Sequence, residues 1–215
     1  MAELSSEELE AGRYLFAQAC TFVLGCANLN QIPVDNLPEI AFAGCSNVGK
    51  SSLINALVGM KALAHTSNTP GRTRQINFFN LADRLMISDL PGYGYARAPK
   101  SQVKQWTTLV ETYLKGRASL RRSFVLVDAR HGVKSSDRNI FRMLDSEAQS
   151  YQVVLTKCDK VKAGPLSSLI DACHSELAKH GAAHPKIATT SARKGDGIPE
   201  LRAAIAALAR PSKLG

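Results

Sequence analysis

One run of eight residues has the types and the spacing of a phosphate-binding loop. It begins with a glycine and ends with glycine, lysine and serine. The residues are Gly44-Cys45-Ser46-Asn47-Val48-Gly49-Lys50-Ser51, followed by Ser52. Glycines let the backbone turn sharply and approach a phosphate, while loop amides and a helix start supply positive charge. Lys50 would reach the β- and γ-phosphates, and the Ser51 hydroxyl would bind Mg²⁺. The chemistry indicated is binding and cleavage of a nucleoside triphosphate.

Two later segments would complete the phosphate site. The segment Asp89-Leu90-Pro91-Gly92 follows an apolar run, so its carboxylate can hold a Mg²⁺-bound water and the Gly92 amide can approach the γ-phosphate. A polar loop between these motifs supplies the residues Gly71-Arg72-Thr73-Arg74-Gln75. We expect the Thr73 hydroxyl, rather than Thr66 or Thr69, to complete the Mg²⁺ shell because Thr73 is nearest the next strand. A solvated loop threonine is the alternative.

A third motif is suited to a guanine base. The stretch Thr156-Lys157-Cys158-Asp159 follows an apolar run and fits the pattern [NT]-K-x-D. The Asp159 carboxylate would accept hydrogen bonds from guanine N1–H and the exocyclic amine, whereas adenine would leave it unpaired at a cost of a few kcal/mol. The Lys157 stem can lie over the base. After the last strand stands Thr190-Ser191-Ala192, where a backbone amide can meet guanine O6.

These motifs need a scaffold that brings the ends of several strands together. Apolar runs at 39–44, 76–81, 85–88, 124–128, 153–155 and 187–189 alternate with helical patterns, and 76–88 forms a hairpin pattern. This alternation predicts a three-layer α/β fold with a mostly parallel, six-stranded sheet containing one antiparallel strand. Ligands bind at the carboxyl ends of such strands, where every motif above is found.

The remaining chain divides into three parts. Residues 1–37 are expected to form an amphipathic helix, from about 6 to 26, and an extended connector packed on the domain edge. Residues 38–210 form the nucleotide-binding domain, and 211–215 a frayed tail. A free partner-binding helix is the alternative for the N-terminal segment.

The composition narrows the class of protein. Of 215 residues, 27 are Lys or Arg and 18 are Asp or Glu, a formal charge of +9 that favours a polyanionic partner. The alternative is a basic protein without such a partner. The five cysteines are scattered and the N-terminus is acidic, which indicates free thiols in the cytoplasm. No run is long enough to span a membrane, and nothing demands more than a monomer.

The chain resembles the small GTPases of the TRAFAC P-loop class. The stretches 44–52, 69–73 and, above all, 89–96 (Asp-Leu-Pro-Gly-Tyr-Gly-Tyr-Ala) are similar to the EngB (YihA/YsxC) family of bacterial ribosome-biogenesis GTPases. Cys45, Arg74 and Cys158 stand where arginine, glutamine and alanine are usual in that family. The resemblance implies GTP and GDP as ligands, slow hydrolysis, binding to the large ribosomal subunit and its rRNA, and a need for the protein in cell division.

Two residues would set the rate of the reaction. Tyr93 follows Gly92 where Ras-like enzymes have a water-orienting glutamine, so we expect slow hydrolysis by Lys50, Thr73 and the loop amides. Asn47 could bind K⁺ in place of an arginine finger, or only stabilise the loop. Two rival functions stay open: a metabolic kinase or ATPase, and an rRNA-binding module that GTP orders with negligible turnover.

The basic residues between 97 and 122 are the candidate rRNA contacts. They are Arg97, Lys100, Lys104, Arg117, Arg121 and Arg122. Tyr93 and Tyr95 could stack on unpaired bases, or could pack the loop onto the following helix.

Overall fold

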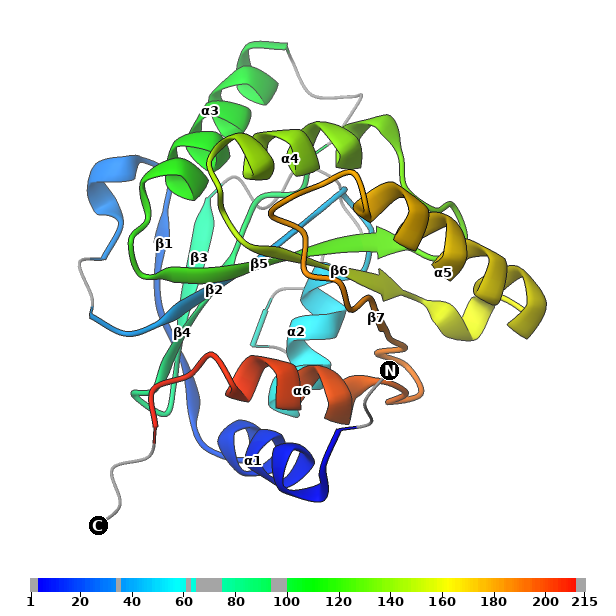
Figure 1. Cartoon of the computed structure of the whole chain (residues 1–215). Helices are drawn as coiled ribbons and strands as arrows, with labels where there is room; N and C mark the ends of the chain where they lie inside the picture. The colour runs from blue at the N-terminus through cyan, green and yellow to red at the C-terminus, as the bar shows by residue number, and fades with distance from the viewer. Residues whose placement is uncertain (1–3, 34–35, 61–62, 65–74, 94–99, 212–215) are drawn as a thin grey trace.

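The fold is a twisted sheet between two layers of helices (Figure 1). A computed structural model describes residues 4–33, 36–60, 63–64, 75–93 and 100–211, with the side chains of 29 and 100–107 left out. The described strands are β1 (Cys20–Cys26), β2 (Glu39–Gly44), β3 (Ile76–Leu81), β4 (Leu85–Asp89), β5 (Leu120–Asp128), β6 (Tyr151–Thr156) and β7 (Ala188–Thr189). The expected α/β class is confirmed, but among the residues that the structure describes the sheet has seven strands, not six.

The strand order β1-β3-β4-β2-β5-β6-β7 brings the motifs to one edge. Within the described sheet, β3 runs antiparallel to both of its neighbours, and the other pairs are parallel. In the parallel register Phe42 faces Asp89, Gly44 faces Leu126, and Asp128 faces Thr156. The carboxyl ends of β2, β4, β5 and β6 therefore meet where the motif residues follow them.

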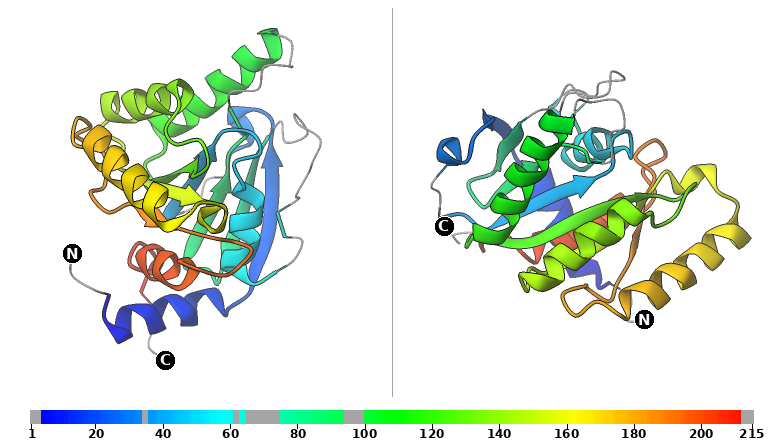
Figure 2. Two further views of the ribbon diagram at one scale, coloured as in Figure 1. Left: turned by 90° about the vertical axis from the view of Figure 1, so that its right-hand side faces the viewer. Right: turned by 90° about the horizontal axis from the view of Figure 1, so that it is seen from above.

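Two apolar layers hold the helices on the sheet. The described helices are α1 (Ser6–Phe16), α2 (Lys50–Val58), α3 (Lys100–Gly116), α4 (Ser135–Ser146), α5 (Ala163–Leu177) and α6 (Ile198–Ala206), with short 3₁₀ turns η1 (Leu29–Gln31) and η2 (Cys158–Lys160). Helices α3, α4 and α5 share one buried cluster, and α1, α2 and α6 share the other. Figure 2 shows the two groups on opposite faces of the sheet. Successive side chains of β2 and β5 point to opposite faces of the sheet. Because helices cover both faces, these strands contribute apolar side chains to both layers.

The N-terminal segment differs from the expectation. The helix ends at Phe16, and 20–26 is a strand paired antiparallel with β3, so the prediction of one helix to residue 26 is wrong. Helical spacing misleads here because Cys20 and Cys26 are buried, whereas Phe22 and Val23 are 54% and 41% exposed. The run Thr-Phe-Val favours a strand, and β3 offers it a hydrogen-bonding edge.

Helix α1 is packed against α6, as Figures 1 and 2 both show. Ser5 and Glu8 form a capping box that begins the helix. The contact is close because Gly12 has no side chain: a β-carbon there would lie 2.5 Å from the backbone nitrogen of Ala203. The Arg202 guanidinium lies 5.7 Å from the centre of the Phe16 ring. The division of the chain into 1–37, 38–210 and 211–215 remains a prediction.

Candidate functional site

The phosphate-binding loop has the backbone geometry that its sequence requires. It leaves β2 at Gly44 and enters α2 at Lys50, and the intervening Gly49 has φ of 106°. This backbone region is costly for a residue with a β-carbon, so glycine is needed there. Asn47 also has a positive φ, 64°, which asparagine tolerates better than most residues. Val48 is buried, while Ser46 is half-buried and Asn47 and Ser52 are exposed.

The lysine of the loop meets the aspartate that ends β4. Lys50 and Asp89 are both buried, and the Lys50 Nζ atom forms an ion pair with Asp89 Oδ1. Ser51, the next residue, is half-buried in the first turn of α2. Hydroxyl and carboxylate oxygens are the hard donors that Mg²⁺ prefers, so Ser51 and Asp89 suit a nucleotide-bound Mg²⁺. Phosphate oxygens and the cation would compete with the Lys50–Asp89 pair for both partners.

The segment after β4 lies directly on the phosphate-binding loop. Ser46 donates its N–H to the Tyr93 carbonyl at 3.0 Å, and Tyr93 donates its own to the Gly44 carbonyl at 3.2 Å. A β-carbon on Gly92 would lie 2.9 Å from Ser46 Oγ and 3.1 Å from its backbone nitrogen. A larger residue at 92 would therefore push Ser46 away, so glycine suits this close approach, and Leu90 and Pro91 are buried beneath it. The structure brings the first two sequence motifs together, as their order predicted.

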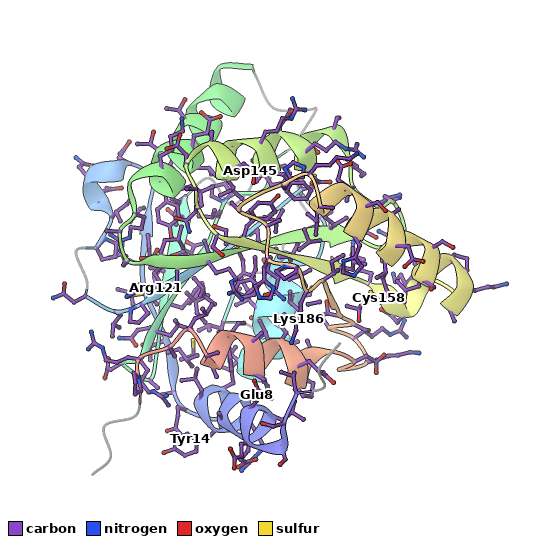
Figure 3. The ribbon with its side chains drawn as sticks, viewed as in Figure 1. Glu8, Tyr14, Arg121, Asp145, Cys158 and Lys186 are labelled. Carbon is purple, nitrogen blue, oxygen red and sulfur yellow. The ribbon has the colours of Figure 1, made fainter. Side chains whose placement is uncertain are left out.

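The base-recognition motif is joined to the same loop. The Thr156 hydroxyl donates to the Val48 carbonyl at 2.7 Å, and Lys157 Nζ donates to the Asn47 carbonyl at 2.6 Å. A hydrogen bond of 3.1 Å runs from the Cys158 N–H to the Thr190 carbonyl. Cys158 itself follows β6, as Figure 3 shows.

The carboxylate expected to recognise guanine is held by the last motif. The Ser191 hydroxyl donates to Asp159 Oδ1 at 2.8 Å. Ser191 is fully buried and Asp159 and Ala192 are half-buried, so the carboxylate is oriented while one side stays accessible. A fixed acceptor is what discrimination between guanine and adenine needs. The assignment of these residues to the base stays a prediction.

Sequence reasoning missed Asp128, which ends β5. Its carboxylate accepts hydrogen bonds from Arg130 Nε at 2.9 Å, Arg130 NH2 at 2.7 Å and Lys157 Nζ at 2.8 Å. Burial raises its pKa, but the hydrogen bonds from Arg130 and Lys157 outweigh that effect and lower the pKa well below its ordinary value. Asp128 therefore stays charged and fixes Lys157 over the loop. An aspartate at the end of an apolar run was the available signal, as it was for Asp89.

The Cys45 thiol points toward the start of helix α4. Its Sγ atom lies 3.3 Å from Ser136 Oγ and 3.4 Å from Asp137 Oδ1, both at the start of α4. Burial, opposed by the Ser136 hydrogen bond and reinforced by Asp137, raises the pKa of Cys45 to about 11. Beside it is a cavity of about 120 Å³ whose lining includes Asp128, His131 and Lys134. The thiol is therefore neutral and faces α4.

Several expected residues lie outside the described part of the chain. They are Gly71, Arg72, Thr73 and Arg74, together with Thr66, Thr69, Tyr95 and Arg97. The choice of Thr73 as a Mg²⁺ ligand stays a prediction. Gln75 is described: it is exposed and donates from Nε2 to Asn77 Oδ1 at 3.2 Å.

One expected rRNA contact is wrong. Arg117 has a largely buried side chain that donates from Nε to Glu39 Oε2 at 2.7 Å. Glu39 is fully buried and also accepts from Ser88, Ser119 and Tyr113, so Arg117 balances its charge. Arg122 is half-buried and donates to Gln152 at 3.2 Å. Arg121 is exposed and lies across the sheet from Cys158 (Figure 3). The side chains of Lys100 and Lys104 are not described.

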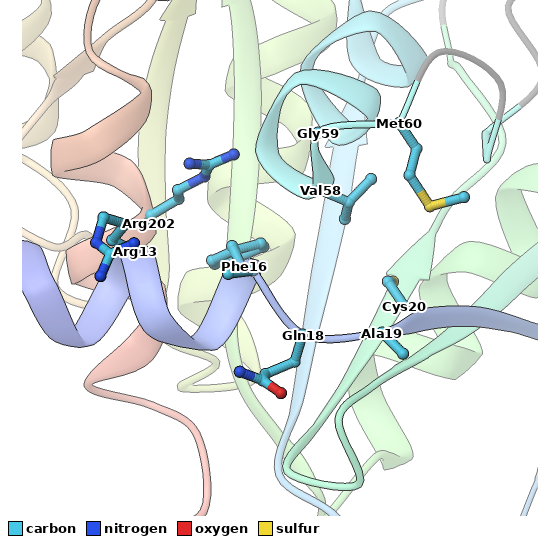
Figure 4. A pocket seen from close by; sticks show the side chains of 10 residues that line it. Arg13, Phe16, Gln18, Ala19, Cys20, Val58, Gly59, Met60 and Arg202 are labelled. Carbon is cyan, nitrogen blue, oxygen red and sulfur yellow. The ribbon is translucent and has the colours of Figure 1, made fainter.

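A larger hollow, of about 560 Å³, lies away from these motifs. It is bordered by α1, β1, α2 and α6, with Phe16, Cys20, Met60 and Arg202 in its lining (Figure 4). Arg202 donates from Nε to the Leu57 carbonyl at 2.8 Å and covers Phe16, so its charge is already engaged. None of the lining residues belongs to the sequence motifs. The edge described above therefore remains the candidate nucleotide site.

Comparisons with known proteins find relatives that are named as GTP-binding proteins. Residues 39–157 match the family described as 50S ribosome-binding GTPase. The chain is 55% identical to "Probable GTP-binding protein EngB" of Rhodospirillum rubrum, over 97% of this chain and 93% of that protein. It is 52% identical to the protein of the same name from Hyphomonas neptunium, over 96% of each.

A solved structure also matches. The chain is similar to "Crystal structure of a probable GTP-binding protein engB" with a TM-score of 0.63 and 26% identity, covering 79% of this chain and 97% of that one. In the part of the chain that the structure describes, no helix is long and apolar enough to cross a membrane.

Proposed function

Because the chain belongs to the EngB family of GTP-binding proteins, we propose that this GTPase is a nucleotide-dependent assembly factor for the large ribosomal subunit. It would act in the cytoplasm as a monomer, and normal growth and septation would depend on it. The description of the matching family, 50S ribosome-binding GTPase, supports the ribosomal partner. The charge of +9 supports contact with rRNA.

One observation carries the nucleotide-dependent part of this proposal. Lys157 Nζ joins the base motif to the phosphate loop through the Asn47 carbonyl, and it joins both to β5 through Asp128. Three strand ends are thus held at fixed distances by one side chain. A guanine base bound by Asp159 and phosphates bound by 44–51 would then be positioned as parts of one ligand.

The reaction would be attack of water on the γ-phosphorus of GTP, which releases phosphate and leaves GDP. Catalysis in this class is mainly positioning and charge stabilisation. Lys50 would neutralise the phosphates, Ser51 and Thr73 would hold Mg²⁺, and that ion would neutralise charge on the β- and γ-phosphate oxygens. Tyr93 directs its hydroxyl to Asp137, at 2.9 Å, and not to an attacking water. Slow hydrolysis by the isolated protein is therefore expected.

Asn47 could accelerate that reaction by binding K⁺. Its side chain is exposed at the edge of the loop, although its φ of 64° gives asparagine a purely structural reason to be there. Hydrolysis is measured in matched KCl and NaCl, with Asn47→Gly as the control that keeps the left-handed backbone. A K⁺ advantage that Asn47→Gly abolishes supports the role, and equal rates in the two salts contradict it.

The ribosomal role is tested by co-sedimentation with purified 50S and 30S particles. We expect binding to 50S particles with a non-hydrolysable GTP analogue and weaker binding with GDP. The matched control is Asp159→Asn, which should lose the nucleotide dependence. Failure to sediment with 50S particles in either nucleotide would overturn the assembly role and leave GTP binding intact.

The orientation of Tyr93 also favours a second candidate function. A module that GTP orders for rRNA binding, with negligible turnover, would need no water-orienting side chain. Phosphate release with and without 50S particles separates the two functions. Stimulated turnover supports the GTPase factor, whereas binding without turnover supports the module.

A further inference from the structure

Tyr93, the residue after Gly92, is anchored by a helix that the sequence motifs do not include. Its hydroxyl donates to Asp137 Oδ1 at 2.9 Å, and Asp137 is almost fully buried in the first turn of α4. Burial, reinforced by the Asp137 charge, raises the pKa of Tyr93 well above its ordinary value, so the phenol remains a neutral donor. Its ring also packs against the apolar layer under α3, α4 and α5.

Asp137 contacts three separate parts of the chain at once. Its Oδ2 atom accepts the Lys134 N–H at 2.8 Å, which caps α4, while Oδ1 accepts from Tyr93 and lies 3.4 Å from the Cys45 thiol. Each carboxylate oxygen thus has its own task. One fixes the helix start and the other fixes the segment after β4 together with the phosphate loop.

The anchored segment is the one that brings Gly92 to the loop. The two hydrogen bonds between Tyr93 and the 44–46 backbone hold it there, and Gly92 touches Ser46. We propose that Asp137 is a positioning residue that, through Tyr93, holds the Gly92 amide at the place where a γ-phosphate binds, and so favours GTP over GDP. The inference rests on the nucleotide-binding part of the proposed function and not on the ribosomal part.

The test compares affinities for two nucleotides in one set of variants. Tyr93→Phe removes only the hydroxyl. Asp137→Asn leaves a single side-chain oxygen for the two donors, the Lys134 N–H and the Tyr93 hydroxyl. The matched control is Tyr151→Phe, because the buried Tyr151 hydroxyl has no hydrogen-bond partner among the described residues. Dissociation constants are measured with Mg²⁺ for GDP and for a non-hydrolysable GTP analogue.

We expect Tyr93→Phe and Asp137→Asn each to weaken the analogue about tenfold relative to GDP, the lower end of what one hydrogen bond to a charged group contributes. Tyr151→Phe should leave the ratio unchanged. The double variant should cost little more than either single change, since both break the same link. In GTP hydrolysis the KM for GTP should rise by a similar factor, because the affinity that is lost is affinity for the γ-phosphate.

Three results would overturn the proposal. They are an unchanged ratio of the two affinities, a ratio shifted toward the analogue, and additive effects in the double variant. Thermal unfolding shows whether a variant is merely unfolded; in that case Gly92→Ala, which would press on Ser46, provides the same ratio test from the loop side. A wild-type protein that ignores ribosomal particles leaves this test unaffected, so the two proposals fail separately.

Discussion

Neutral groups hold most of the predicted guanine side of the site (156–159 and 190–192), whereas buried charges hold the predicted phosphate side (44–51 and 89–93). On the guanine side, Thr156 donates to a carbonyl, Cys158 bonds through its backbone, and Ser191 orients Asp159. On the phosphate side, Lys50 forms an ion pair with Asp89. The Asp137 carboxylate there contacts both Tyr93 and Cys45. The two sides meet at Lys157 and Asp128.

The difference concerns what a ligand must replace. A guanine base can add to the bonds around Asp159 without breaking the one from Ser191, since a carboxylate has acceptor sites to spare. Phosphates and Mg²⁺ take partners that Lys50 and Asp89 now give to each other. The guanine side should therefore keep its hydrogen bonds when nucleotide binds, whereas the phosphate side should exchange its ion pair for contacts with the nucleotide.

The largest effect should follow from Lys50→Met. It leaves the buried Asp89 carboxylate without its cation, which should cost about 3 kcal/mol of unfolding free energy. It should also weaken GTP and GDP by about 100-fold or more, because a charge on the phosphates is lost. Chemical denaturation and a fluorescent GDP analogue measure the two effects.

The double variant Lys50→Met, Asp89→Asn is the control for that result. It should recover most of the stability, since no buried charge stays unpaired, yet it should not recover nucleotide binding. Recovery of both would mean that Lys50 serves the fold and not the phosphates. That outcome would remove the contrast between the two sides.

A slightly smaller effect is expected for Asp159→Asn on the guanine side. GTP affinity should fall by about 100-fold, a few kcal/mol, while affinity for xanthosine triphosphate should rise, since an amide can donate to the xanthine carbonyl. Stability should change little. Ser191→Ala, which keeps the carboxylate but removes its 2.8 Å donor, should cost only about fivefold. Equal wild-type affinities for GTP and ATP would contradict the role of Asp159.

The parts of this site that sequence predicts are those written in consecutive residues. The loop 44–51 and the motif 156–159 each need a strand end, a turn and a helix start, and local patterns indicate all three. Parallel topology then brings their ends together, as the register confirms. The sheet class followed from the same alternation.

The missed parts depend on pairs far apart in the chain. Asp137 lies 44 residues from Tyr93 and 92 from Cys45, and a lone aspartate in the first turn of a helix is ordinarily a cap. The local sequence gives no sign of the partner of Arg117, because that partner, Glu39, is 78 residues away. Likewise, 20–26 fits a helical period until the edge of β3 gives it a partner. Local periodicity does not determine any of these pairings.

Where the two sides meet, Asp128→Asn should have an intermediate effect. Lys157 would lose its charged partner and hold the loop less firmly, so GDP and the GTP analogue should both weaken by about tenfold, without a change in their ratio. This result contrasts with the changed ratio expected for Tyr93→Phe. If Asp128→Asn changed the ratio of the affinities for GDP and the GTP analogue, the Lys157–Asp128 pair would belong to the phosphate side.

The pH dependence of stability gives Asp128 a second test. Its folded pKa is lowered below its unfolded value of about 4, so its stabilisation is complete above that pH and is lost as pH falls through the lower folded pKa. The stability difference between wild type and Asp128→Asn should thus stay constant from about pH 5 to 8 and shrink below about pH 4. A difference that varied between pH 5 and 8 would contradict the assigned hydrogen bonds.

The smallest effect is expected at Cys45, although it lies within the phosphate loop. Its thiol faces Ser136 and Asp137, so Cys45→Ala should change GDP affinity by no more than about threefold, because Asp137 keeps its stronger bond from Tyr93. With a pKa of about 11, only about one thiol in a thousand is ionised at pH 8, so iodoacetamide should react roughly 100-fold more slowly than with an ordinary cysteine. Site-resolved mass spectrometry follows that reaction with and without GDP. Rapid alkylation that GDP blocks would place the thiol against the phosphates. The phosphate loop would then be positioned by its own contacts and not by the Asp137 carboxylate of α4.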